Sequence, residues 1–235
     1  MLKAVFFDLD GTLLPLDEDV FIKKYFSLLC RRMSSLGYES DKLIKCIMDG
    51  TYAMLKNSGE KTNEEVFWNL FEERYGKEKL KDKAYLDEFY TNEFCEIKEV
   101  CLENNLAKEL VCFCKKSGLK VILSTNPIFP KVGTLTRMGF IGLKEEDFDF
   151  ITTYENSYFC KPNPKYFKFL LNKFRLKPEE VIVIGNNVYE DGDCSFACGI
   201  KCYVTGDFII GYDKAKYEYE KIKFEDLINV IKSYL

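Results

Sequence analysis

Short apolar runs recur along the chain in a pattern that predicts a parallel β-sheet. The first run covers residues 4–9 and stops at Gly11. Similar runs occupy residues 119–124, 150–153, 181–185 and 201–204. Continuous apolar runs of this length are typical of strands that are buried on both faces of a sheet. Because helical patterns stand between most of them, we expect a doubly wound α/β sheet with right-handed crossovers.

The stretch between the first two runs predicts an insertion. It is about a hundred residues long, far more than a crossover between strands needs. Apolar residues recur in it at helical spacing up to Gly37 and again up to Gly59, where glycine favours the end of a helix. Thr62 and Glu65 have the spacing of a capping box that begins a third helix. A fourth helix is expected over residues 82–94.

These elements predict two domains. A Rossmann-type core is expected to comprise residues 1–15 and 99–235, and an inserted α-helical cap is expected to comprise residues 16–98. The last helix of the core is predicted over residues 224–234. The segment 213–223, which is rich in lysine, tyrosine and glutamate, is interpreted as solvated surface.

Composition fixes the class of protein. With 235 residues, 47% of them apolar and 31% charged, the chain has the profile of an ordinary globular protein. Its amino terminus carries only a very short apolar run before Asp8, unlike a signal peptide, so a cytoplasmic location is expected. The ten scattered cysteines are expected to be thiols in a reducing compartment and not a disulfide framework.

Charge and the lack of histidine exclude several classes of function. The net charge of −4 offers no general attraction for nucleic acid or for an anionic membrane, so a small substrate is expected instead. Without histidine the chain cannot build a Ser-His-Asp or Cys-His nucleophile, a histidine phosphatase or an imidazole zinc site. Carboxylates are therefore the expected acid/base groups.

The strongest chemical signal is the sequence Asp8-Leu-Asp10-Gly11-Thr12, at the end of the first predicted strand. Ligands bind at the carboxyl ends of strands in an open α/β sheet, so two acids at this position favour a functional site over a helix-capping turn. The chain breaks into a loop at Gly11, which allows both carboxylates to turn toward one crevice.

This motif resembles the Asp-x-Asp-Gly-Thr signature of the haloacid dehalogenase-like (HAD) hydrolase superfamily, in its phosphatase branch. The resemblance implies that Asp8 attacks phosphorus and becomes an aspartyl phosphate. It also implies that Asp10 protonates the leaving oxygen and then activates water. A carboxylate nucleophile divides hydrolysis into two displacements, and a nearby acid/base assists both. Phosphatases of the family carry an acid at the position of Asp10 and the dehalogenase branch lacks it, which favours phosphoryl transfer.

Two later segments resemble the phosphate-binding elements of the same family. Thr125 and Asn126 end the second predicted strand, and Lys161 stands next to a proline before a predicted helix. The resemblance implies that the phosphate is held by Thr12, Thr125, Asn126 and Lys161. Hydroxyl and amide groups donate hydrogen bonds to phosphate oxygens, and an ammonium group offsets the repulsion between phosphate and Asp8. Ser-Thr-Asn-Pro is also an ordinary turn sequence, so a structural interpretation of Thr125 stays open.

The last motif follows the fourth predicted strand and resembles the acidic metal-binding loop of the family. The resemblance implies a Mg²⁺ cofactor with four ligands, Asp8, Asp10 (through its backbone carbonyl), Asn186 and Asp191. Most members carry an acid where this chain has Asn186. An amide oxygen is a hard ligand but brings no charge, so the affinity for Mg²⁺ is expected to be lower, unless Glu190 or Asp191 compensates.

Together these motifs predict a Mg²⁺-dependent phosphohydrolase that acts on a small phosphorylated metabolite beneath a closing cap. The resemblance implies sugar phosphates, phosphoglycolate or nucleoside monophosphates as substrates. A sugar phosphomutase is one alternative. The other alternative, prompted by Asn186, is a non-catalytic relative that binds a phosphorylated metabolite or a partner protein without turnover.

One further pattern is interpreted as structural. Cys194, Cys198 and Cys202 recur at four-residue spacing. The pattern crosses Gly199 from a predicted helix into a predicted strand, and no histidine completes a metal site. Core packing is therefore the preferred interpretation of these cysteines.

Overall fold

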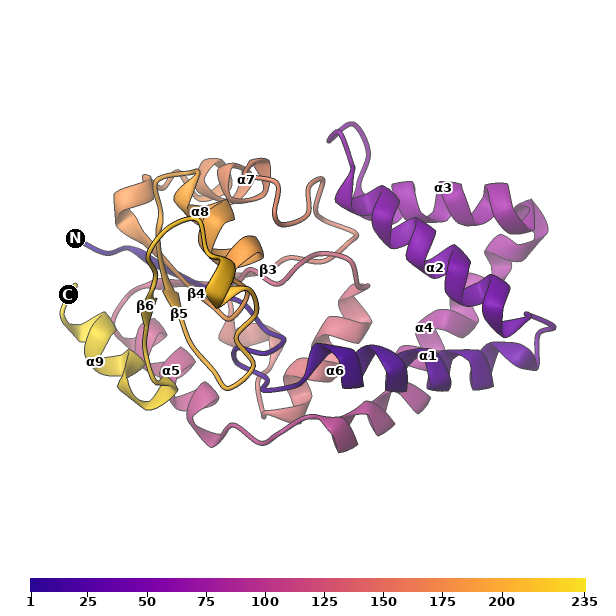
Figure 1. The fold of residues 1–235 in the computed structure, drawn as a ribbon, viewed down its shortest axis with the longest axis horizontal. Helices are drawn as coiled ribbons and strands as arrows, with labels where there is room; N and C mark the ends of the chain where they lie inside the picture. Colours follow the sequence, from indigo (N-terminus) through magenta and orange to yellow (C-terminus); the bar gives the residue numbers. More distant parts are fainter.

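Six parallel strands form the sheet in the computed structural model, which describes residues 1–235 (Figure 1). Their order across the sheet is β3-β2-β1-β4-β5-β6. The strands are β1 (Ala4–Phe7), β2 (Lys120–Leu123), β3 (Phe150–Ile151), β4 (Val181–Gly185), β5 (Lys201–Val204) and β6 (Glu220–Lys221). β1 lies in the middle and pairs in parallel with both β2 and β4. This arrangement confirms the predicted α/β fold class.

Helices of the core follow the strands along the chain. The longer ones are α5 (Asn105–Lys116), α6 (Lys131–Phe140), α7 (Lys165–Phe174) and α9 (Leu227–Lys232). Short helical segments are η3 (Glu145–Asp147), η4 (Pro178–Glu180), η5 (Val188–Asp193), α8 (Cys194–Phe196), η6 (Tyr212–Lys214) and η7 (Phe224–Asp226). No helix in the chain combines the length and the apolarity that crossing a bilayer requires.

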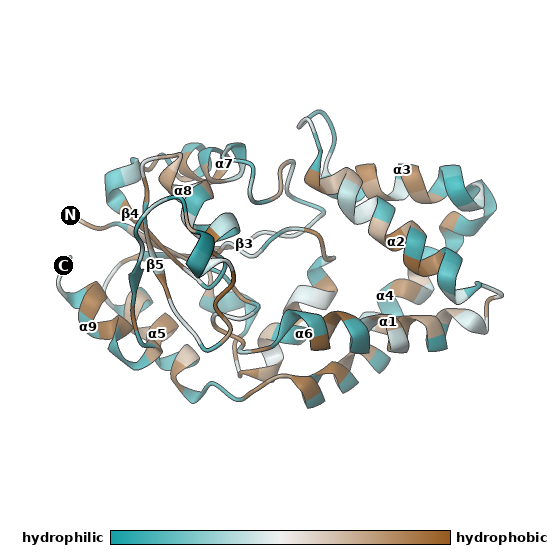
Figure 2. Cartoon of the chain, viewed as in Figure 1, coloured by the Kyte–Doolittle hydropathy of each residue, from teal (hydrophilic) through white to brown (hydrophobic).

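Strand β1 is buried on both faces, which explains its continuous apolar sequence. Val5 and Phe7 belong to one hydrophobic cluster, which includes Leu110 of α5. Phe6 belongs to a second cluster, which includes Phe167 of α7. Alternate side chains of a strand point to opposite faces, so the sheet needs helices on both sides. Figure 2 shows the apolar strands enclosed between helices that carry hydrophilic residues.

β6 is a strand that the sequence did not predict. Glu220 and Lys221 are exposed, as expected for the segment 213–223, but they pair with Tyr203 and Val204 at the edge of the sheet. Two charged residues lack the apolar pattern by which a buried strand is recognised. Backbone pairing with β5 defines this strand instead.

A helical insertion separates β1 from β2. It consists of α1 (Glu18–Ser34), α2 (Ser40–Leu55), α3 (Asn63–Tyr75), η1 (Lys77–Asp82), α4 (Lys83–Thr91) and η2 (Glu93–Val100). At the start of α3, Glu65 N donates a hydrogen bond to Thr62 Oγ1 and Thr62 N donates one to Glu65 Oε2, which confirms the predicted capping box. The fourth helix is shorter than predicted and ends at Thr91, because Asn92 adopts φ −112° and ψ −95°, outside the helical region.

The two segments that connect the insertion to the sheet run side by side. Leu16 and Cys101 form an isolated antiparallel bridge. Next to it, Leu102 N donates a hydrogen bond to Pro15 O at 2.8 Å. The chain therefore leaves the sheet and returns to it through one short paired ribbon.

The cysteines of the carboxyl-terminal half contribute to the core. Cys194 and Cys202 lie in the same hydrophobic cluster as Phe6, and Cys198 packs against that cluster. All ten cysteines are free thiols. Burial raises the pKa of the Cys194 thiol, which disfavours the thiolate form that would bind a metal. The structural interpretation of these residues is confirmed.

Candidate active site

The sheet order brings the predicted site residues to one edge. Asp8 directly follows β1, Thr125 comes two residues after β2, and Asn186 directly follows β4. These three strands are neighbours, so their carboxyl ends meet. Lys161 reaches the same point from the loop before α7, and Asp191 from η5.

Asp8 is buried and each of its carboxylate oxygens has a partner. Lys161 Nζ lies 2.8 Å from Asp8 Oδ1, and Thr12 Oγ1 donates to Asp8 Oδ2 at 3.2 Å. The tight turn between Asp8 and Thr12 depends on Gly11, whose φ is +80°. A Cβ atom at this position would lie 2.1 Å from Asn186 Nδ2, so a larger residue would displace Asn186.

Lys161 is held between two carboxylates. Its Nζ atom lies 2.6 Å from Asp191 Oδ1 as well as beside Asp8, and the side chain is 1% exposed. Burial lowers the pKa of Lys161, but the negative charges of Asp191 and Asp8 outweigh this effect and raise the pKa well above its ordinary value. Asp191 Oδ2 accepts a hydrogen bond from Asn187 N at 3.1 Å. Both oxygens of Asp191 are thus engaged, and its direct contact is with Lys161.

Asn186 is fixed in one orientation. Its Nδ2 atom donates to the carbonyl of Phe208 at 2.8 Å, which turns Oδ1 toward Thr12. Thr12 Oγ1 lies 3.2 Å from Asn186 Oδ1 and also 3.2 Å from Asp8 Oδ2. A hydroxyl has one proton to donate, so it can serve only one of these oxygens at a time. Of Asp8 Oδ2 and Asn186 Oδ1, the oxygen that does not receive this proton keeps a free lone pair.

Both oxygens are of the kind that binds a hard cation. Asp8 contributes a charged carboxylate and Asn186 a neutral carbonyl, and oxygen ligands of both kinds suit Mg²⁺. No group of three or more Asp, Glu, Cys or His side chains is arranged to hold a metal ion. A cation at this position would therefore depend on Asn186 and on backbone carbonyls beside Asp8.

Asp10 also reaches this site, but its partner comes from α6. Asp10 Oδ2 lies 3.3 Å from Arg137 Nη1, and Asp10 Oδ1 is buried without a hydrogen-bond partner. Burial raises the pKa of Asp10, the charge of Arg137 lowers it, and the charge of Asp8 raises it, with a net upward shift. The protonated form is favoured relative to an ordinary aspartate.

The loop after β2 supports the lysine. Asn126 Oδ1 accepts a hydrogen bond from Lys161 N at 3.2 Å, and Asn126 Nδ2 donates to Glu190 Oε2 at 2.9 Å. The carbonyl of Thr125 accepts hydrogen bonds from Thr152 Oγ1 and Tyr166 Oη. Asn126 therefore positions Lys161, and both Thr125 and Asn126 line the cavity described next.

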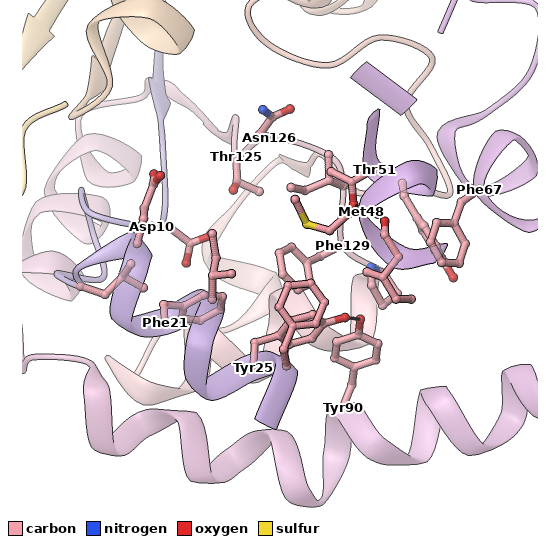
Figure 3. A pocket seen from close by; sticks show the side chains of 18 of the residues that line it. Asp10, Phe21, Tyr25, Met48, Thr51, Phe67, Tyr90, Thr125, Asn126 and Phe129 are labelled. Atoms are coloured by element: carbon pink, nitrogen blue, oxygen red, sulfur yellow. Dashed lines mark hydrogen bonds between the residues drawn. The ribbon is translucent and has the colours of Figure 1, made fainter. Parts of the chain in front are cut away.

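A cavity of about 260 Å³ opens at these residues and continues into the helical insertion. Asp8, Asp10, Thr125 and Asn186 line its inner end. In Figure 3, Asp10 lies at one side of this space and Phe67 at the other, with residues of α1 between them. The sheet thus supplies the polar end of the cavity, and the insertion supplies its wall.

The sequence also matches the family model of haloacid dehalogenase-like hydrolases over residues 2–192. The chain belongs to this family. Comparison with curated protein sequences gives no match.

Solved structures of haloacid dehalogenase-like proteins share the fold of the whole chain. A HAD phosphatase from Thermococcus onnurineus matches with a TM-score of 0.61 and 19% identity, and 98% of each chain is covered. A Thermotoga maritima protein described as a β-phosphoglucomutase matches with a TM-score of 0.59 and 23% identity over 100% of both chains. The HAD-hydrolase YfnB from Bacillus subtilis, solved with bound magnesium, matches with a TM-score of 0.58 and 19% identity, covering 98% of this chain and 99% of that one. At these identities the likeness concerns the fold.

Arg137 is one polar residue of this haloacid dehalogenase-like hydrolase that the motifs did not predict; Glu18 and Asp87, which line the cavity, are two others. Arg137 is 0% exposed, and its guanidinium lies 4.1 Å from the centre of the Phe129 ring. None of its three side-chain nitrogens has a hydrogen-bond partner. Its position could have drawn attention to it: it lies on the buried face of α6, between Thr134 and Met138, where an arginine is unusual.

Proposed function

We propose that the protein hydrolyses a small phosphate monoester, with Asp8 as the nucleophile and Mg²⁺ as the cofactor. The observation that carries this proposal is the contact of 2.8 Å between Lys161 Nζ and Asp8 Oδ1 at the inner end of the cavity. The ammonium group is fixed beside the attacking oxygen, where it would offset the charge of an incoming phosphate. A carboxylate so placed is suited to nucleophilic catalysis.

In the first step, an oxygen of Asp8 forms a bond to phosphorus and the bond to the leaving oxygen breaks. Asp10 donates its proton to that oxygen, and its raised pKa favours the protonated form that this step needs. In the second step, Asp10 accepts a proton from water while the water oxygen attacks phosphorus. Inorganic phosphate leaves and Asp8 is restored.

Asp8, Asn186 and the backbone carbonyl of Asp10 are the ligands that we propose for Mg²⁺. When bound there, the cation would offset the negative charge of the phosphoryl group. Asp191 would act through Lys161, because both its oxygens are already engaged. The magnesium in YfnB and the oxygen pair of Asp8 and Asn186 support this choice of cofactor.

We also propose that residues 16–98 act as a cap over a core of residues 1–15 and 99–235. The cavity wall supports this division, because it includes residues of α1, α2, α3 and α4 as well as the strand ends. Enclosure of the phosphoryl group by such a cap would exclude bulk water during attack by Asp8.

The free cysteines favour a location in a reducing compartment. All ten cysteines are free, including the exposed Cys95 and Cys112. Exposed thiols persist best where cellular reductants are present, so the cytoplasm is the proposed location.

Hydrolysis of phenyl phosphate in Mg²⁺ and in EDTA tests the proposed function. We expect release of inorganic phosphate with Mg²⁺ only, and loss of at least a thousandfold in kcat for Asp8→Asn, because the amide is a poor nucleophile. Asp226→Asn is the matched control, since Asp226 is exposed and does not line the cavity. Beryllium fluoride, which mimics a phosphoryl group on aspartate, should raise the Tm of the parent protein with Mg²⁺ and leave that of Asp8→Asn unchanged.

Two results would count against hydrolysis. One is full activity in Asp8→Asn, which would remove Asp8 from its role. The other is a Tm that rises with phosphorylated ligands although no ester is turned over. That second result would favour a binding protein whose metal site is weakened by Asn186.

A further inference from the structure

The wall of the cavity is mainly aromatic. Phe21, Tyr25, Phe67, Trp68 and Phe129 all line it, and they come from α1, α3 and the loop after β2. Figure 3 shows Tyr25 and Phe129 between the polar end, marked by Asp10, and the far end, marked by Phe67. A leaving group bound at the polar end would therefore extend across ring faces.

The polar atoms of the aromatic side chains in this wall are paired with one another. Tyr25 Oη and Tyr90 Oη are 3.0 Å apart and share a hydrogen bond. Trp68 Nε1 donates to Tyr154 Oη at 3.3 Å. The ring faces themselves offer no hydrogen-bond partner to the hydroxyl groups of a sugar, so the loss of water from those hydroxyls would go uncompensated there.

The charge of the wall excludes anionic leaving groups. No lysine or arginine is among the residues that line the cavity, whereas Glu18 and Asp87 are. Lys83, the basic residue nearest to Asp87 on α4, pairs with Glu64 instead. A carboxylate or a second phosphate on the substrate would therefore face acidic side chains and no cation, which disfavours its binding.

The volume limits the size of the leaving group. The cavity holds about 260 Å³ in all. An apolar cavity of about 150 Å³ is enough to bind benzene. The space beyond the phosphoryl position thus accommodates a group of about one ring.

We propose that the substrate is a phosphate monoester whose leaving group is a ring-sized, apolar alcohol without negative charge, such as an aryl or cycloalkyl alcohol. This inference rests on the proposed function, and it narrows the substrate class. Sugar phosphates, phosphoglycolate and bisphosphates are disfavoured by the wall. A phosphomutase is disfavoured for the same reason, because its bisphosphate would need a second cationic subsite.

Binding of the product alcohol tests the wall without any turnover. Trp68 is the single tryptophan of the chain and lines the cavity, so its fluorescence reports on occupancy. Cyclohexanol, myo-inositol and 4-hydroxycyclohexanecarboxylate share one ring but differ in hydroxyl number or charge, and none absorbs with tryptophan. We expect saturable quenching or a spectral shift with cyclohexanol, and binding at least about tenfold weaker for the other two. Equal or tighter binding of the polyol or the carboxylate would overturn the inference.

The matching kinetic test uses phenyl phosphate, 4-carboxyphenyl phosphate and glucose 6-phosphate with Mg²⁺. Phenyl phosphate should have the highest kcat/KM, by about tenfold or more. Thr51→Lys places a cation in the wall and should raise kcat/KM for the carboxylated ester relative to phenyl phosphate. Tyr52→Lys is the matched control, because Tyr52 is 62% exposed on the same helix and does not line the cavity.

The outcomes separate the two proposals. The enzyme could hydrolyse all three esters but prefer glucose 6-phosphate or the carboxylated ester. That result would overturn the inference and leave the proposed function standing. Hydrolysis of none would overturn the proposed function, while the Trp68 titration would still decide what the cavity binds. If Thr51→Lys does not fold, the three substrates with the parent protein remain decisive.

Discussion

Arg137 and Asp10 form an ion pair that connects α6 to the nucleophile loop, with Arg137 Nη1 at 3.3 Å from Asp10 Oδ2. The guanidinium is buried, lies against the Phe129 ring and makes no hydrogen bond. Its charge is therefore compensated mainly by Asp10. The protonation of Asp10 and the stability of this contact should depend on each other.

Removal of the Arg137 charge should destabilise the protein and shift its activity profile. Arg137→Met leaves Asp10 without its partner, and breaking a buried ion pair costs about 3–5 kcal/mol. Because Arg137 lowers the pKa of Asp10, that pKa should rise in the variant. Since the first step needs the protonated form of Asp10, the alkaline limb of the kcat/KM profile should move to higher pH, and urea unfolding at neutral pH should show the loss of stability.

The double variant Asp10→Asn/Arg137→Met is the control for stability. Without either charge, most of the lost stability should return, because no uncompensated buried charge remains. If the losses of the single variants simply add in a double-mutant cycle, the two side chains are not coupled.

Lys161→Met should lose both activity and stability. The change leaves Asp8 and Asp191 facing each other without the cation between them, and we expect a cost of about 3–5 kcal/mol at neutral pH. The cost should shrink at low pH, where protonation of the carboxylates removes their repulsion. Lys165→Met, at an exposed position nearby, should behave like the parent protein in the same urea titrations. Equal stability of the two variants would contradict the assigned role of Lys161.

Asn186→Asp should have opposite effects with and without metal. In EDTA the added charge lies near Asp8, and an oxygen replaces the amide that donates to Phe208 O, so the Tm should fall. With Mg²⁺ the charged ligand should bind the cation more tightly, by about tenfold or more in calorimetric titration. An unchanged titration would mean that this side chain is not a ligand.

Glu190 should make the metal-free protein less stable as pH rises. Burial raises the pKa of Glu190 from 4.5 to about 8, so between these values the folded state holds a proton that the unfolded chain has lost. Stability falls with pH wherever the folded state binds more protons. In EDTA, Glu190→Gln should therefore lose less stability than the parent protein between pH 5 and pH 8 in thermal unfolding. Glu225→Gln, on the surface, should keep the parent slope.

The strands and the polar end of the site could be predicted because they follow from local sequence. Apolar runs mark β1, β2 and β4, and parallel strands bring the residues that follow them to one edge. Asp8, Lys161 and Asn186 were therefore expected near one another, and they are. Their chemical roles remain proposals.

The rest of the site depends on packing between distant segments. Phe21 and Tyr25 have the helical spacing of core residues, and the sequence does not distinguish an apolar side chain that fills a core from one that lines a cavity. Arg137 was missed because its partner lies far away in the sequence, in the loop after β1. The hydrogen bonds of the Asn126 side chain with Lys161 and Glu190 join segments far apart in the sequence, so no turn motif reveals them, and its phosphate contact stays a prediction.

The paired ribbon at Leu16 and Cys101 would restrict how the helical insertion moves relative to the sheet. Two separate linkers would let the helical insertion slide or twist in several directions, but strands that are hydrogen-bonded to each other must bend together. If the insertion swung about the ribbon as a hinge, the entrance of the cavity would widen. Asp8, Thr125 and Lys161 all lie on the sheet side of that hinge and would keep their spacing. Admission of a new ester would then leave the attacking group and its counter-charge undisturbed from one turnover to the next.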